Sequence, residues 1–190
     1  MSIIINGVNI PNNGDFIKYN GTNIEKVVCN GIEVWKKQKD ITLTPTNHHG
    51  LTVTGLWARS YESYRGDLDG ETYSIEIENV DLTSYNKIRC NIEVTNSVTT
   101  SNGGSITVKL VAGGSSNSKV VGRVYAEYDP DEPGRGNSVT ENAVVELNVS
   151  GVTGQRTVYI DMKLYHGTNH VDEGNLIGRY SVKSIEFLSQ

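Results

Sequence analysis

The sequence has few cysteines, and this shortage excludes a fold held together by disulfide bonds. Its two cysteines, Cys29 and Cys90, are too few for the disulfide framework of a small secreted domain. Cys90 falls on the apolar side of an alternating segment, which predicts a small buried side chain. The sequence leaves open the redox compartment in which the chain works.

Concentrated positive charge is also lacking. The net charge is −5, and the largest basic cluster is Lys36, Lys37 and Lys39. A surface that follows a phosphate backbone needs many clustered cations, so no nucleic-acid partner is expected. The N-terminus carries no basic region before its three isoleucines, and no apolar run is long enough to cross a bilayer. Neither a signal peptide nor membrane insertion is therefore expected.

The arrangements that usually accompany catalysis are missing as well. His48, His49, His166 and His170 all fall in predicted loops, and there is no Gly-x-Ser-x-Gly motif. His166 and His170 have a spacing that pairs ligands only on a helix, which the intervening glycine disfavours. We expect no enzymatic activity and no catalytic residues.

Alternation with a period of two dominates the region from residue 41 to 190. Such alternation is typical of strands with one buried and one solvated face, and no useful segment has a helical period. Glycine-rich and polar turns separate the strands, which predicts an all-β fold with a two-sheet, jelly-roll-like β-sandwich at 41–190. A loss of phase at Lys183-Ser184 predicts a β-bulge. The residues expected to point inward include Tyr73, Ile75, Ile77, Ile88, Cys90, Ile92, Val94, Ile106, Val108, Leu110, Ala143, Val145, Leu147, Val149, Val158, Ile160, Met162 and Leu164.

The first 36 residues contain three copies of an Asn-Gly pair between β-forming residues. Asn-Gly favours the type I′ turn of a β-hairpin, because both central residues need positive φ. The pattern predicts an antiparallel meander over 1–36, with a strand over 22–29, that serves in assembly or docking. The polar residues 37–40 are expected to link it to the sandwich. The three pairs are Asn6-Gly7, Asn20-Gly21 and Asn30-Gly31.

Alternating acids form the one candidate metal site. Asp67, Asp69 and Glu71 lie in a predicted loop, as calcium ligands often do, although the full twelve-residue calcium-binding pattern is absent. They predict a structural calcium ion, the alternative being a polar turn. No other cofactor is expected.

Aromatic residues supply the candidate ligand surfaces. Tyrosine can stack on a sugar ring while its hydroxyl stays wet. Tyr159 and Tyr165 are expected on the solvent side of one strand, with Asp161 and Lys163 between them. Arg123 and Tyr125 are expected to share one face of a neighbouring strand. A second group lies in a turn-rich segment. Either group could bind a saccharide, or else cover a second sheet or a subunit interface. The second group consists of Trp57, Tyr61 and Tyr64.

The Asn-Gly repeat resembles a segment found in minor structural and tail proteins of phages and prophages of Gram-positive bacteria. The resemblance covers residues 19–37 closely and implies a virion tail or baseplate component that folds in the host cytoplasm. It further implies a homo-oligomer, other tail proteins as partners, and a sandwich that contacts a cell-surface glycan. The residues that carry it are Tyr19-Asn20-Gly21-Thr22 and Asn30-Gly31-Ile32-Glu33-Val34-Trp35.

Two alternatives stay open beside a tail protein with host-recognition function. One is a free-standing carbohydrate-binding module of a bacterium, since 41–190 resembles carbohydrate-binding jelly rolls in pattern. The other is an accessory of a cell-wall or polysaccharide hydrolase, with Glu76 among its acids.

Overall fold

The computed structural model describes residues 3–5, 8–10, 18–19, 22–23, 26–30, 32–36, 40–64, 66–99, 103–125, 136–167 and 175–189. Every regular element within these ranges is a β-strand, which confirms the predicted all-β class. No helix that could span a membrane occurs in this part of the chain. From residue 41 the strands are β7 (Ile41–Leu43), β8 (Val53–Gly55), β9 (Ala58–Tyr64), β10 (Thr72–Asp81), β11 (Lys87–Val98), β12 (Gly103–Ala112), β13 (Ser115–Tyr125), β14 (Asn137–Asn148), β15 (Gln155–Gly167) and β16 (Asn175–Leu188).

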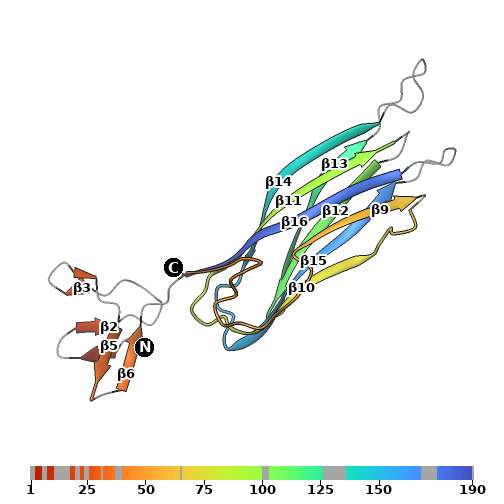
Figure 1. Cartoon of the computed structure of the whole chain (residues 1–190). Coiled ribbons are helices and arrows are strands. Elements are labelled where there is room, and N and C mark those ends of the chain that lie inside the picture. Colours follow the sequence, from red (N-terminus) through yellow and green to blue (C-terminus); the bar gives the residue numbers. More distant parts are fainter. Residues whose placement is uncertain are drawn as a thin grey trace.

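These strands form two antiparallel sheets that pack as a sandwich (Figure 1). One sheet has the order β13-β12-β15-β10-β8. The other has the order β14-β11-β16-β7, and β9 pairs with the first half of β16. The connection from β9 to β10 therefore passes from one sheet to the other. The predicted two-sheet sandwich is confirmed.

The core follows the alternation of the sequence. In β11 the buried side chains alternate with partly exposed ones along the whole strand. The predicted inward residues of β10, β11, β12, β14 and β15 are buried, except Tyr73, which is partly buried against the core. Cys90 is a fully buried free thiol, and burial raises its pKa to about 12. Burial of alternate side chains by both sheets is the main source of stability.

Three β-bulges interrupt the described strands of the sandwich, and one of them, in β10, shifts its register with β15 between Ile77 and Val80. Of the other two, the first shifts the β11–β16 register at Lys183, because Ile92 pairs with Val182 while Asn91 pairs with Ser184. This confirms the bulge predicted from the sequence. The second lies in β13 and shifts its register with β12 between Gly104 and Ile106.

The N-terminal Asn-Gly pairs each lie between two short antiparallel strands. β1 (Ile3–Ile5) pairs with β2 (Val8–Ile10), β3 (Lys18–Tyr19) with β4 (Thr22–Asn23), and β5 (Lys26–Cys29) with β6 (Ile32–Lys36). Asn30 has a φ of 50°, as a type I′ turn requires.

The expected meander over 1–36 stays a prediction, because the residues that join the hairpins lie outside the described part of the chain. Among the described residues, the three hairpins are three two-stranded sheets, and the described parts of the predicted strand 22–29 are β4 and β5. Of the predicted linker 37–40, only Asp40 is described, and its carboxylate accepts hydrogen bonds from the backbone and hydroxyl of Ser189, at 2.8 and 2.7 Å.

Candidate functional site

Exposed aromatic side chains gather on the outer face of the sheet β13-β12-β15-β10. Tyr125 on β13 is 60% exposed, and Tyr165 and Tyr159 on β15 are 53% and 37% exposed. Val120 on β13 adds a further exposed apolar side chain. The predicted exposure of Tyr159 and Tyr165 is confirmed. This face therefore offers apolar surface that the sandwich itself does not use.

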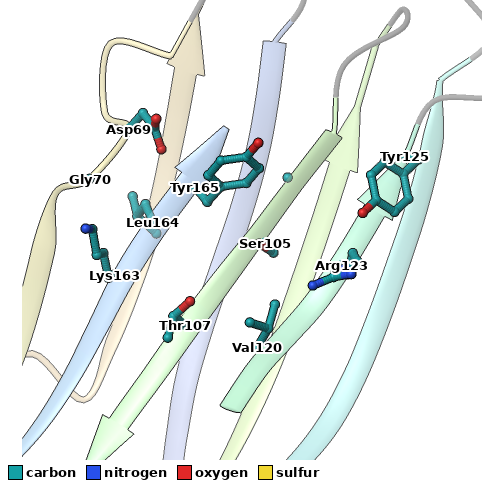
Figure 2. Close-up of a pocket in the computed structure, with 11 residues that line it drawn as sticks. Asp69, Gly70, Ser105, Thr107, Val120, Arg123, Tyr125, Lys163, Leu164 and Tyr165 are labelled. Carbon is teal, nitrogen blue, oxygen red and sulfur yellow. The ribbon is translucent and has the colours of Figure 1, made fainter. Parts of the chain in front are cut away.

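A pocket of about 480 Å³ lies at one end of this face, where β12 begins and β13 and β15 end. Its size is within the usual range of small-molecule sites. Figure 2 shows Tyr125 and Tyr165 on the two sides of β12, with Ser105 between them and Thr107 farther along the same strand. The pocket is lined by Asp69, Gly70, Gly104, Ser105, Thr107, Val120, Arg123, Tyr125, Lys163, Leu164 and Tyr165.

Two glycines leave room for the tyrosine rings. Gly103 of β12 pairs with Tyr125 on one side and with Gly167 of β15 on the other. A Cβ on Gly103 would lie 2.8 Å from Cδ1 of Tyr125, and a Cβ on Gly167 would lie 3.2 Å from the hydroxyl of Tyr165. Larger residues at either position would displace a ring. The small floor thus lets both rings lie close to the sheet.

The bulge in β13 turns Arg123 and Tyr125 outward. Val121 and Gly122 are consecutive and both buried, so the alternation restarts and places the next exposed side chains at Arg123 and Tyr125. Gly122 has a φ of +60°, and a Cβ there would overlap Val94 of the facing sheet. Glycine is the residue that tolerates both conditions. The predicted common face of Arg123 and Tyr125 is confirmed.

A buried chain of hydrogen bonds ties this bulge to the opposite sheet. The Tyr61 hydroxyl on β9 donates to Oδ1 of Asn96 on β11, and Nδ2 of Asn96 donates to the carbonyl of Gly122 at 2.6 Å. Glu141 Oε2 accepts the Gly122 N–H at 2.8 Å. Burial raises the pKa of Tyr61 well above its ordinary value, so the phenol keeps the proton that it donates. The backbone below Arg123 is therefore held by side chains of β11 and β14, and Tyr61 of β9 holds Asn96 in place.

The other side of the pocket is held by the loop between β9 and β10. The Gly70 N–H donates to the Leu164 carbonyl, and the Leu164 N–H donates to the carbonyl of Glu71, both at 2.9 Å. The Asp69 carboxylate accepts the backbone N–H of His166 at 3.2 Å. These bonds fasten Asp69 beside the end of β15.

His166 lies in β15 and is 3% exposed, which corrects its predicted place in a loop. The strand continues through it because Gly104 of β12 still pairs with it. Its Nδ1 accepts the Gly66 N–H at 2.8 Å and also contacts the Ser63 hydroxyl at 3.1 Å. Since Nδ1 is an acceptor, the neutral ring carries its proton on Nε2. His166 thereby anchors the loop that carries Asp69.

Lowering the pH is expected to weaken the fold through His166. Burial lowers the pKa of this imidazole below 6.5, more than Asp67 and Asp69 raise it, so the unfolded chain binds its proton more readily than the folded one. The stabilisation is complete above about pH 6.5 and is lost as the pH falls towards the folded pKa. Urea unfolding at pH values from 7.5 to about 5 measures this loss.

The control for that experiment is His166→Asn, which keeps an acceptor near the Nδ1 position and cannot titrate. Its stability should fall less between pH 7 and 5 than that of the wild type. Asp67 does not confound this window, because a hydrogen bond from Ser63 lowers the pKa of its carboxyl below 3.8. Equal pH dependence in both proteins would contradict the assignment.

The structure does not bring Asp67, Asp69 and Glu71 together as calcium ligands. Asp67 accepts the Tyr64 N–H, Asp69 the His166 N–H, and Glu71 the hydroxyl of Tyr73. Among the described residues, no group of three or more acidic, histidine or cysteine side chains could hold a metal ion. Each carboxylate stabilises a local turn or strand end, which corresponds to the alternative stated above. The histidine His170 lies outside the described residues.

Of the two predicted aromatic groups, the structure brings three members of the first together at the pocket. Arg123, Tyr125 and Tyr165 meet at the pocket, with β12 between their strands, so β13 and β15 are not direct neighbours. Tyr159 lies six residues before Tyr165 on β15, about 20 Å away, and stays outside the pocket.

The group Trp57, Tyr61 and Tyr64 does not form a surface cluster. Trp57 is half-buried and stacks on His48, with ring centroids 5.7 Å apart. Tyr61 is buried in β9, and Tyr64 is exposed at the end of that strand. The sequence suggested turns here, but the segment pairs with β16 as a regular strand. Tyr61 is therefore a core residue and is removed from the candidate ligand surface.

Sequence analysis did not select several pocket residues as ligand contacts. Ser105 and Thr107 occupy the polar positions of the alternating strand β12, and that pattern could have placed them on the outer face. Lys163 lies between Tyr159 and Tyr165 on β15, and the same alternation places it on the outer face. No signal in the sequence placed the Asp69 loop beside β15, because that contact is made by backbone hydrogen bonds between distant segments.

No protein-family model matches the sequence, and no curated protein matches it. The chain is similar to a solved carbohydrate-binding module, CBM28, whose description calls it specific for non-crystalline cellulose. The two share 14% identity with a TM-score of 0.40, over 73% of this chain and 80% of the other. So distant a likeness carries no argument about a ligand, and the function is argued from the geometry of the pocket.

Proposed function

We propose that this chain is a non-catalytic saccharide-binding module whose ligand occupies the pocket between Tyr125 and Tyr165. The observation that carries the proposal is the pair of exposed tyrosine rings above a floor of glycine, serine and threonine. Apolar C–H faces of a sugar ring pack on aromatic rings, and its hydroxyls bond to short polar side chains. Both kinds of group face the same pocket here.

The carboxylates at the pocket fit a binding role better than a role in hydrolysis. Hydrolysis of a glycosidic bond usually needs two carboxylates that flank it, and Asp69 is the one carboxylate lining the pocket in the described part of the chain. Glu76 lies on β10 opposite Tyr159 and is not part of the pocket. The hydrolase alternative therefore has no pair of acids at this site.

The place of the module on a virion tail stays a prediction from the N-terminal resemblance, as do the homo-oligomer and the tail partners. In that setting the proposed ligand is a glycan of the host cell surface. A free-standing bacterial module with the same pocket would bind its saccharide in the same way, so the proposed site does not depend on this choice.

Binding of the full chain to arrays of bacterial cell-wall and plant polysaccharides tests the proposal. Tyr125→Ala/Tyr165→Ala should weaken saturable binding about tenfold or more, because the two stacking surfaces are lost. Tyr159→Ala is the matched control: it removes an exposed tyrosine from the same face outside the pocket and should leave binding unchanged. Saturable binding that survives in the double variant, or no saturable binding at all, would contradict the proposal.

A further inference from the structure

The pocket has the opposite charge balance to the whole chain. The chain carries a net charge of −5, whereas the pocket is lined by two cations, Arg123 and Lys163, and one acid, Asp69. An excess of cations in a concave site of an acidic protein favours negatively charged ligands there.

In the described part of the chain, the two cations have no acidic partner. Other cations of the sandwich form ion pairs: Lys87 and Arg89 with Glu146, Lys183 with Glu93, at 2.8–3.2 Å. Within the described residues, Arg123 and Lys163 form no ion pair. No acid of the described residues neutralises their charges, which leaves both cations to pair with a ligand.

The nearby acids are held by other donors. The Asp69 carboxylate accepts the backbone N–H of His166, and Asp161, two residues before Lys163, accepts the Ser74 hydroxyl at 2.6 Å. The Lys163 side chain instead runs beside Gly70, whose added Cβ would lie 3.8 Å from Lys163 Cε. The lysine therefore lies in contact distance of the loop at the edge of the pocket.

Arg123 and Lys163 stand on opposite sides of the pocket floor. Arg123 is on β13 and Lys163 on β15, and β12 lies between them, so their strands are about 10 Å apart. Along the strands they are also offset by about two residues, since Lys163 pairs with Thr107 and Arg123 lies in the bulge opposite Gly104 and Ile106. Lys163 pairs with Thr107 of β12, whose side chain lies between the two cations in Figure 2. The backbone at Arg123 is fixed by the bulge bonded to Asn96 and Glu141. The guanidinium therefore projects from a rigid part of the strand.

Resting on the proposed saccharide-binding function, we propose that the pocket selects acidic saccharides, with Arg123 and Lys163 binding the carboxylates of uronic-acid units. A guanidinium offers paired N–H donors that match a carboxylate, and the lysine adds a second positive charge across the floor. Tyr125 and Tyr165 would stack on the rings that carry these groups. A neutral polysaccharide would leave both cations without a counter-charge.

The test compares polygalacturonate with its fully methyl-esterified form, using the full chain and isothermal titration calorimetry or affinity electrophoresis. Polygalacturonate should bind at least tenfold more tightly, and Arg123→Gln and Lys163→Gln should each lower that affinity about tenfold. Lys109→Gln is the matched control, because Lys109 is an exposed lysine on the same face, in β12, that does not line the pocket. Dextran sulfate beside dextran tests whether any polyanion suffices.

The outcomes separate this inference from the function on which it rests. If neutral and acidic polymers bind equally and only the tyrosine variants weaken binding, acid selection is wrong and saccharide binding stands. If Lys109→Gln weakens binding as much as Lys163→Gln, or dextran sulfate binds as tightly as polygalacturonate, the attraction is diffuse and the inference fails. If no saturable saccharide binding occurs, both fail.

Discussion

Replacing Asn96 by alanine is expected to lower the free energy of unfolding by about 2–6 kcal/mol. Asn96 is fully buried and accepts from the hydroxyl of Tyr61 while it donates to the carbonyl of Gly122. The alanine variant leaves both partners buried without a hydrogen bond, and each such group costs about 1–3 kcal/mol. Denaturant unfolding followed by circular dichroism measures the loss.

The matched control is Asn142→Ala, because Asn142 is exposed on β14 of the same sheet. Its effect should stay within about 0.5 kcal/mol. The Asn96 variant should also weaken saccharide binding at temperatures where it is folded, since the bulge below Arg123 loses its tie to the opposite sheet. A change in stability no larger than that of the control would show that the buried chain of hydrogen bonds contributes little.

Gly122→Ala is expected to destabilise the protein by about 2–5 kcal/mol, the sum of backbone strain and overpacking. The φ of +60° is unfavourable for alanine, and the added Cβ would overlap Val94 and come within 3.0 Å of Nδ2 of Asn96. Relief of the overlap requires β13 to move, which would turn Arg123 and Tyr125 away from the pocket. Thermal unfolding and saccharide binding of the same variant measure the two effects.

The control variant Gly114→Ala measures the cost of backbone strain without the cost of a steric overlap. Gly114 lies in the turn before β13 with a φ of +86°, and a Cβ there would have no atom within 4 Å. It should therefore cost about 1–2 kcal/mol from strain alone and leave binding unchanged. Equal losses in the two alanine variants would contradict the proposed overlap with Val94.

The outer face of the candidate site was largely predictable from the sequence. The alternation of Val158, Ile160, Met162 and Leu164 assigns the opposite side of β15 to solvent, and the exposure of Tyr165 follows directly. Arg123 and Tyr125 are two residues apart and share a face for the same reason. The strength of these predictions comes from strands whose inward positions are consistently apolar.

The burial of residues could not be predicted in strands whose inward side chains are polar. In β9 the inward side chains are Arg59, Tyr61 and Ser63, so hydrophobic alternation does not mark the strand. Tyr61 was accordingly assigned to a ligand surface, although its hydroxyl bonds to Asn96 in the core. His166 was placed in a loop because its burial depends on the Gly66 N–H and Ser63, which come from a distant segment.

The amino-acid sequence by itself determined the strand class, the two faces of most strands and the outward position of Tyr159 and Tyr165, because a period of two is a local property of the chain. Only the tertiary structure decided that β12 lies between β13 and β15, that the bulge at Gly122 restores Arg123 to the outer face, and that Asp69 stands beside Tyr165. These features depend on hydrogen bonds between segments far apart in the chain, whose pairing no local pattern specifies.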